Sequence, residues 1–370
     1  MHDDLNAIIK QFNFTGQYST ITPYGNGHIN DTYAVTFHAE SGETNRYILQ
    51  RINHQIFKQP EALMQNVEKV TAYLKKKILA SGGTPARECL TLINTFAGQT
   101  LYRSPAGNYW RAYLFIEGAQ TYEVVEKMEH IYNAAWAFGH FQHMLNDFPV
   151  NELTETIPDF HHTPKRYQAF VEAVQQDRFH RAANVQDEIN FAMARADETS
   201  LLVDMQAEGK LPLRVTHNDT KFNNVMIDDE TGKGICILDL DTVMPGLSLY
   251  DFGEIVRTGA NLAPEDAQDL SGVHLDLATF DVLTHGYLDA ANKTLTPNEL
   301  DFLPYGPKMM AYENGIRFLT DYLQGDIYFK IHREDQNLDR CRTQFKLVTD
   351  MENKFQAMHD IVNKYRSYGG

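Results

Sequence analysis

The amino-acid sequence predicts an α+β fold with two lobes, a small lobe built on an antiparallel sheet and a large lobe that is mainly helical. The first observation is that residues 17–52 alternate apolar and polar side chains between short turns, which is typical of neighbouring strands. The second is that, after Gly118, apolar residues recur every three or four positions over long stretches, which is typical of helices. We therefore expect one lobe at residues 1–117 and the other at 118–370.

The individual elements follow from the same patterns. The small lobe is expected to open with three antiparallel strands and then a helix, at residues 18–21, 32–37, 46–51 and 60–78. The helix is predicted because Leu63, Val67 and Val70 share one face. Further strands are expected near residues 90–93, 99–102 and 109–116. The helices of the large lobe are expected at residues 128–146, 164–178, 186–207, 296–323 and 340–366.

Composition and charge limit the classes of partner. The 370 residues are 43% hydrophobic and 22% charged, values that exclude a disordered or fibrous chain. Basic residues number 33 and acidic residues 49, so the net charge of −16 disfavours nucleic acid and anionic membrane surfaces. Small molecules are the expected partners, and a nucleotide stays possible because backbone amides or a metal ion can bind phosphate. We expect a monomer or a small homo-oligomer.

The cysteines and the first residues favour a cytoplasmic protein. No stretch reaches the roughly 18 consecutive apolar residues of a membrane span, and residues 1–6 lack the basic-then-apolar pattern of a secretory signal. Cys89, Cys236 and Cys341 lie far apart in sequence, so neither a disulfide framework nor a thiolate zinc site is predicted. Any bound metal is therefore expected to have oxygen ligands.

One segment of the helical half breaks its pattern and carries the chemistry. Two short apolar runs, at residues 213–228 and 234–241, flank a charged turn and predict a hairpin. Asp219 lies five residues before Asn224, and Asp239 follows fifteen residues later, which matches the spacing of the protein-kinase catalytic loop and its metal aspartate. Phosphoryl transfer needs a carboxylate beside the acceptor hydroxyl and two oxygen ligands for Mg²⁺. The alternative is a loop in which these side chains only cap turns.

Two further aspartates compete for the metal role. Asp251 begins a literal Asp-Phe-Gly sequence, but it opens a helical stretch instead of ending a strand. We therefore expect Asp251 to cap that helix or to hold the catalytic loop by accepting its backbone amides. Asp241 points to the same side as Asp239 by strand alternation, so it ranks second as a ligand.

The resemblance to known families rests on several of these segments. The aminoglycoside phosphotransferase and choline kinase superfamily of small-molecule kinases resembles the chain at residues 215–224, 237–241 and 250–252. Within that superfamily, the N-acetylhexosamine 1-kinases are closely similar at residues 23–30, 46–50, 239–246 and 317–329. The likeness covers nearly the whole chain. It implies a protein-kinase-like fold whose first lobe binds nucleotide, with ATP and Mg²⁺ as cofactors.

The resemblance also implies a role for individual residues. The catalytic base would be Asp219, and the metal ligands would be Asn224 and Asp239. The nucleotide would be bound by Gly25, Asn26, Gly27, Ile48, Gln50, Ile116 and Glu117. The acceptor would be bound by His28, Asp219, Arg317 and Tyr322.

The chain departs from the kinase pattern at two positions in the small lobe. Gln50 stands where related kinases have the lysine or arginine that reaches the phosphates, and alternation turns Arg51 to the other face. The basic residue that reaches the phosphates is therefore missing or displaced. Its carboxylate partner would be sought at Glu68 on the following helix, and Glu68 could equally be a solvated residue. The resemblance implies that residues 25–29 form the turn that covers the phosphates, and Asn30 stands in place of the third glycine of that kinase pattern.

The implied activity is transfer of phosphate from ATP to the anomeric hydroxyl of an N-acetylhexosamine, giving the sugar 1-phosphate. One alternative keeps the fold and changes the acceptor to another sugar, an amino alcohol or an aminoglycoside. Another is a catalytically silent nucleotide-binding protein, suggested by the uncharged Gln50. For Arg317, the alternative to an acceptor role is a helix-stabilising pair with Asp321 at i to i+4.

Overall fold

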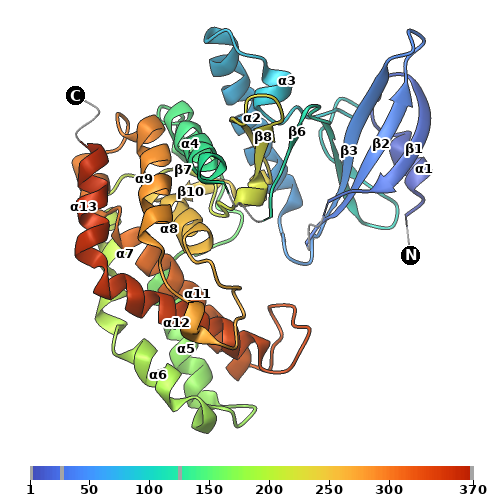
Figure 1. The fold of residues 1–370 in the computed structure, drawn as a ribbon. Coiled ribbons are helices and arrows are strands. Elements are labelled where there is room, and N and C mark those ends of the chain that lie inside the picture. The colour runs from blue at the N-terminus through green and yellow to red at the C-terminus, as the bar shows by residue number, and fades with distance from the viewer. Residues whose placement is uncertain (1–2, 26–28, 124–126, 367–370) are drawn as a thin grey trace. The chain divides into compact units, whose positions relative to one another are not determined.

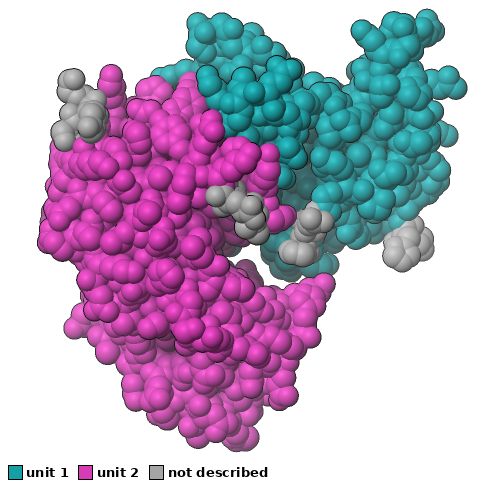
Figure 2. All heavy atoms as spheres, in the orientation of Figure 1, with its two compact units in different colours: residues 1–121, 147–158, 225–245 teal, residues 122–146, 159–224, 246–370 magenta. Residues whose placement is uncertain are grey.

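The computed structural model describes residues 3–25, 29–123 and 127–366, and the chain forms two compact units. The first unit comprises residues 1–121, 147–158 and 225–245, and the second comprises residues 122–146, 159–224 and 246–370 (Figures 1 and 2). The chain therefore passes between the units several times. The division into continuous domains at 1–117 and 118–370 stays a prediction.

The first unit is organised by a five-stranded antiparallel sheet with the strand order β1-β2-β3-β5-β4. A second, three-stranded sheet joins β6, β8 and β9. The strands of the unit are β1 Gln17–Pro23, β2 Asp31–His38, β3 Thr44–Ile52, β4 Tyr102–Arg103, β5 Tyr109–Leu114, β6 Ala119–Gln120, β8 Val225–Asp228 and β9 Gly234–Ile237. Its helices are α1 Leu5–Ile9, α2 Pro60–Ala80 and α3 Pro85–Glu88.

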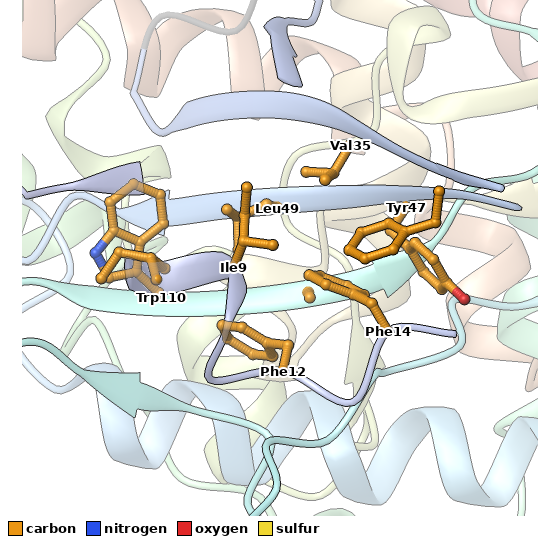
Figure 3. Close-up of a cluster of buried hydrophobic side chains, with 10 residues drawn as sticks. Ile9, Phe12, Phe14, Val35, Tyr47, Leu49 and Trp110 are labelled. Carbon is orange, nitrogen blue, oxygen red and sulfur yellow. The ribbon is translucent and has the colours of Figure 1, made fainter. Parts of the chain in front are cut away.

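An aromatic core covers one face of the five-stranded sheet. Alternation turns Leu49 of β3 and Trp110 of β5 to this face, where Phe12 and Phe14, which follow α1, pack against them (Figure 3). All four side chains are buried. The opposite face carries Gln50 and its neighbours in the ladder, so that the two faces of β3 separate an apolar core from a polar network.

The second unit is mainly helical. Its helices are α4 Met128–Met144, α5 Thr163–Gln176, α6 Gln186–Met193, α7 Leu201–Ala207, α8 Ser248–Gly259, α9 Leu277–Ala291, α10 Pro297–Phe302, α11 Tyr305–Leu323, α12 Gln336–Asn353 and α13 Phe355–Arg366. Its short strand is β7 Arg214–Thr216, and β10 Met244–Gly246 lies at the change from one unit to the other. Helices α4 and α9 can approach closely because Gly139 has no Cβ: a Cβ at this position would lie only 2.3 Å from the Tyr287 main-chain oxygen.

The predicted elements agree with most of the observed ones. The three-stranded meander, the helix from Pro60 and the hairpin of β8 and β9 are confirmed. The strand expected at 90–93 is wrong, because there Leu92 forms only an isolated bridge with Tyr113. The single helix expected at 296–323 is also wrong: α10 ends at Phe302, and Pro304, which has no backbone N–H to donate, lies before α11.

The helices expected at 186–207 and 340–366 are likewise each divided in two. Between α6 and α7, the Thr199 hydroxyl donates to the Ala196 main-chain oxygen over 2.7 Å, a local bond that competes with the helical ladder. In the described ranges, no helix is long and apolar enough to cross a membrane.

Candidate active site

Asp219 lies in a loop of the second unit, directly after β7. Asn218, the residue before it, has a left-handed backbone with φ of 63°, which asparagine adopts more readily than most residues. The Asp219 backbone amide lies 3.2 Å from Nδ1 of His217. The Asn224 amide group donates to the main-chain oxygen of Asp219 over 2.8 Å and lies 3.3 Å from its carboxylate. The loop therefore brings the predicted base and one predicted metal ligand together.

Lys221, which the sequence analysis did not select, is the counter-ion of Asp219. Its Nζ atom lies 2.6 Å from Oδ1 of Asp219. Burial alone would raise the pKa of Asp219, but the Lys221 ammonium, His217 and the Asn224 amide bring it below its ordinary value. The pKa of Lys221 is raised in return, chiefly by Asp219. Asp219 is thus ionised at neutral pH and can accept a proton or a hydrogen bond from a hydroxyl group.

Asp251, in the first turn of α8, anchors this loop. Its carboxylate accepts hydrogen bonds from the main-chain amides of His217 and Asn218 over 2.9 and 2.7 Å. Its own main-chain oxygen accepts the Thr220 hydroxyl over 2.6 Å. Asp251 is 1% exposed, and this burial raises the pKa of its carboxyl above the ordinary value. Of the two roles predicted for Asp251, accepting the loop's backbone amides is confirmed, whereas the N-cap position of α8 is Leu247.

A buried glutamine on α4 completes the support of the loop. Gln142 donates from Nε2 to the Asp251 carboxylate over 2.8 Å and to the Val215 main-chain oxygen over 2.9 Å. The His217 ring packs edge-on against Phe138 and Phe141 of the same helix, with centroid separations of 5.5 and 6.2 Å. Helix α4 therefore fixes the loop through one polar side chain set among apolar ones.

The hairpin that leads to Asp239 belongs to the first unit. Val225 pairs with Ile237, Asn224 directly precedes the first strand, and Asp239 follows the second after one residue. The backbone of Asp239 is left-handed, with φ of 52°, a conformation that non-glycine residues rarely adopt and that is enriched at functional sites. Asp239 then begins a short 3₁₀ turn at Leu240–Thr242.

The two predicted metal ligands carry oxygen donors of the kind that a hard divalent cation prefers. No cluster of three or more His, Cys, Asp and Glu residues suited to a metal occurs among the described residues. Because the Asn224 amide nitrogen is committed to Asp219, its amide oxygen is the end left to act as a ligand. Amide and carboxylate oxygens are the ligands that Mg²⁺ prefers, so Asn224 and Asp239 suit it chemically.

The Gln50 side chain is held within the first unit. Its amide nitrogen donates to Oγ1 of Thr32 over 2.9 Å, and its oxygen accepts from Nε and Nη2 of Arg111 over 2.9 and 2.6 Å. Arg51 lies on the opposite face, as alternation predicts, and forms an exposed pair with Asp31. Arg111 is therefore a buried cation on the same face of the sheet as Gln50, and the sequence analysis missed it.

The other predicted residues of the nucleotide site have varied surroundings. Asn26 and Gly27 lie outside the described residues, whereas Gly25 has a left-handed backbone with φ of 75°, which glycine adopts without strain. Ile48 lies on the same strand face as Gln50. Glu68 accepts a hydrogen bond from the Thr100 hydroxyl, and among the residues that the structure describes it forms no ion pair with a strand cation.

Ile116 and Glu117, the last two residues predicted to bind the nucleotide, lie in a segment that is held on two sides. Ile116 is buried, and the exposed Glu117 carboxylate pairs with Arg46 of β3. The Glu117 main-chain oxygen accepts a hydrogen bond from Arg87, whose guanidinium also pairs with Asp228 over 2.5 Å.

The residues predicted to bind the acceptor lie on or near α11, apart from His28, which is outside the described residues. The Arg317 guanidinium lies 5.6 and 5.5 Å from the ring centroids of Phe160 and Phe329. Tyr322 is buried, and the guanidinium of Arg181 lies 4.5 Å from its ring centroid.

Asp321 has a different role from the helix pair considered for it. Its carboxylate accepts the main-chain amides of Ile327, Tyr328 and Phe329 over 2.9, 2.7 and 2.9 Å. Within the described part of the chain, no ion pair joins it to Arg317. Asp321 therefore clamps the loop that follows α11, and the Arg317 guanidinium lies beside two aromatic rings.

The class of protein follows from the fold, the loop and a family match. An ionised aspartate, a neighbouring asparagine and a further aspartate after a hairpin are the parts that phosphoryl transfer requires. Residues 20–281 match the family described as the phosphotransferase enzyme family, and this range contains Asp219, Asn224 and Asp239. The chain belongs to this family.

Solved structures share the fold at low sequence identity. An aminoglycoside phosphotransferase from Alicyclobacillus acidocaldarius is 11% identical with a TM-score of 0.60, over 98% of this chain and 96% of that one. A microcompartment-associated aminopropanol kinase is 13% identical with a TM-score of 0.58, over 96% and 99%. An amicoumacin kinase solved with AMP-PNP and Ca²⁺ is 13% identical with a TM-score of 0.58, over 95% and 94%. These likenesses confirm the predicted kinase-like α+β fold.

Proposed function

We propose that this protein transfers the γ-phosphoryl group of ATP to the anomeric hydroxyl of an N-acetylhexosamine, giving the sugar 1-phosphate and ADP. The observation that carries the proposal is the ionised Asp219 in a loop anchored by the buried Asp251. Membership of the phosphotransferase family and the likeness to a kinase solved with AMP-PNP and Ca²⁺ support ATP and a divalent cation as cofactors.

The residues of this chain have distinct roles in the proposed reaction. A bond forms between the acceptor oxygen and the γ-phosphorus, the bond from that phosphorus to the β,γ-bridging oxygen breaks, and Asp219 takes the proton of the hydroxyl. Asn224 and Asp239 would hold Mg²⁺, which when bound neutralises charge on the phosphates. Lys221 keeps Asp219 ionised and stands as a second positive charge beside the reacting groups.

The acceptor is proposed from the resemblance at residues 23–30 and 317–329 and from the surroundings of Arg317. A charged fork between two aromatic rings suits a sugar, because the rings can cover apolar C–H groups while the guanidinium donates to hydroxyl or acetamide oxygens. His28 and Tyr322 complete the proposed acceptor set.

The test is product formation with a panel of acceptors, ATP and Mg²⁺, with the position of the phosphate determined by phosphorus NMR. We expect N-acetylglucosamine or N-acetylgalactosamine to be phosphorylated at C1 and glucose to be a much poorer substrate, because a site built from hydrogen bonds discriminates steeply against a missing group. Equal use of glucose, or preference for an amino alcohol or aminoglycoside, would reject the sugar assignment and keep the kinase.

Two variants separate the base from the acceptor site. Asp219→Asn should reduce turnover by roughly 10²–10⁴-fold with little change in ATP affinity. Arg317→Ala should raise the KM for the sugar far more than the KM for ATP. Arg340→Ala is a matched control, since that guanidinium also lies beside a ring of α11, at 5.6 Å from Phe318. An equal effect of both arginine changes would show that Arg317 acts through stability alone.

A further inference from the structure

The two departures of the small lobe from the kinase pattern, Gln50 and Asn30, are joined by one buried network. Gln50 of β3 lies directly opposite Arg111 of β5 in the antiparallel ladder. Asn30, which precedes β2, donates from Nδ2 to Oδ2 of Asp241 over 2.7 Å. Arg111 and Asp241 lie between them, so the network consists of Asn30, Thr32, Gln50, Arg111 and Asp241. All of these residues belong to the first unit.

Gln50 serves in this network as a positioning residue for a cation. Its oxygen receives two hydrogen bonds from Arg111, and its nitrogen is used by Thr32 of the next strand. Both ends of the amide are therefore committed to protein groups, which leaves none for a phosphate. The positive charge absent at position 50 of β3 is present on the neighbouring strand, at the residue directly opposite.

Arg111 is paired in a way that fixes its charge. Arg111 is 1% exposed and Asp241 is 2% exposed. The Nη1 atom of Arg111 lies 2.5 Å from Oδ1 of Asp241. Burial alone would lower the pKa of Arg111, but Asp241 and, more weakly, Asp239 keep it above its ordinary value. A buried guanidinium without a carboxylate is costly, so the two residues depend on each other.

Asp241 is occupied on both of its oxygens. Oδ1 faces Arg111, and Oδ2 accepts from Asn30, whose own amide oxygen accepts the backbone amide of Asn53 over 2.9 Å. Asn30 is the residue directly before β2, so these two hydrogen bonds fix the start of that strand. Asp241 therefore links Asn30 to the buried arginine, and a metal ion at either of its oxygens would have to share that oxygen with one of these donors.

We infer that Arg111 supplies, on β5, the fixed positive charge that related kinases carry at the position of Gln50, and that Asp241 is its counter-charge instead of the principal metal ligand. This inference rests on the proposed use of ATP. It assigns the displaced charge to the strand next to Gln50, and it leaves Asp239 as the metal aspartate of the hairpin.

The pairing is tested first by a double-variant cycle in melting temperature, measured without nucleotide. Arg111→Gln and Asp241→Asn should each lower the melting temperature, and the double variant should lose much less than the sum, because it leaves no unpaired buried charge. Arg51→Gln is the matched control, since Arg51 is an arginine of the neighbouring strand β3 and its ion pair with Asp31 is exposed. Strictly additive losses would overturn the pairing.

The role toward nucleotide is tested by calorimetric titration with AMP-PNP at several Mg²⁺ concentrations. Arg111→Gln should weaken binding by roughly tenfold or more, as expected for a lost unit charge near a polyphosphate. The exchange variant, Gln50→Arg with Arg111→Gln, returns the charge to β3 and should recover most of the affinity. Asp241→Asn should keep the Mg²⁺ dependence of the wild type, whereas Asp239→Asn should lose it.

Two results would overturn the inference. One is a folded Arg111→Gln variant that binds AMP-PNP as tightly as the wild type, and the other is loss of Mg²⁺ dependence on changing Asp241. If the wild type binds AMP-PNP but phosphorylates no sugar, the proposed acceptor fails while the inference stands. If the wild type binds no nucleotide, the phosphate-side role of Arg111 fails together with the kinase assignment, and the melting cycle still decides whether Asp241 is its partner.

Discussion

Replacing Asp251 with alanine should destabilise the second unit and release the catalytic loop. The carboxylate accepts three hydrogen bonds, from the backbone of His217 and Asn218 and from Gln142, at 2.7–2.9 Å. Each such bond to a buried charge contributes about 1.5–3 kcal/mol, and part of this offsets the cost of burying the carboxylate. We therefore expect a loss of about 3–5 kcal/mol in the free energy of unfolding, within the range for removing one partner of a buried charged cluster.

Urea unfolding followed by circular dichroism measures the stability change, and hydrogen exchange of residues 214–220 measures the release of the loop. The backbone amides of His217 and Asn218 should exchange much faster in Asp251→Ala than in the wild type, since both lose their acceptor. Asp269→Ala is the control, because Asp269 is exposed and accepts a single local amide, that of Ser271. An unchanged urea midpoint with protected loop amides would refute the anchoring role.

Three further predictions address other parts of the molecule. Asp239→Ala should abolish Mg²⁺-dependent AMP-PNP binding in calorimetry with little change in melting temperature; a large melting change with binding retained would assign it a structural role. Lys221→Met should move the acid limb of the pH–turnover profile to higher pH, because losing the ammonium raises the pKa of Asp219 and the base is then protonated at a higher pH; an unmoved limb would remove Lys221 from control of the base. Gly139→Ala should cost about 1–3 kcal/mol or more of stability in urea unfolding, since the added Cβ would lie 2.3 Å from the Tyr287 carbonyl oxygen; a variant as stable as the wild type would show that α4 and α9 can separate at no cost.

The sequence was informative where a residue's role depends on near neighbours. Alternation over residues 17–52 predicted the meander, and the spacing of Asp219 and Asn224 placed both in one loop. The position of Asp251 at the start of a helix, and not at the end of a strand, limited its predicted role to capping that helix or holding the loop, and the structure shows the second.

The sequence was uninformative where a role depends on distant partners. Arg111 stands in an ordinary strand pattern, and only the fold shows that it is buried against Asp241, 130 residues further along the chain. Gln142 is a single polar residue in an apolar helix, so its contact with Asp251 could not be read from periodicity. Lys221 was the exception, because its place two residues after Asp219 could have suggested an ion pair.

The interleaved order of the first unit also bears on how the protein is made. A nascent chain that has reached residue 121 already contains the five strands of the larger sheet, but β8, β9 and Asp241 have not been synthesised. At bacterial and eukaryotic elongation rates, the 130 residues between Arg111 and Asp241 take roughly 6–26 s to add. During that interval the sheet would have to bury an arginine without its carboxylate, which is unfavourable. We therefore expect the polar side of the sheet to stay open on the ribosome until the hairpin emerges and supplies the carboxylate.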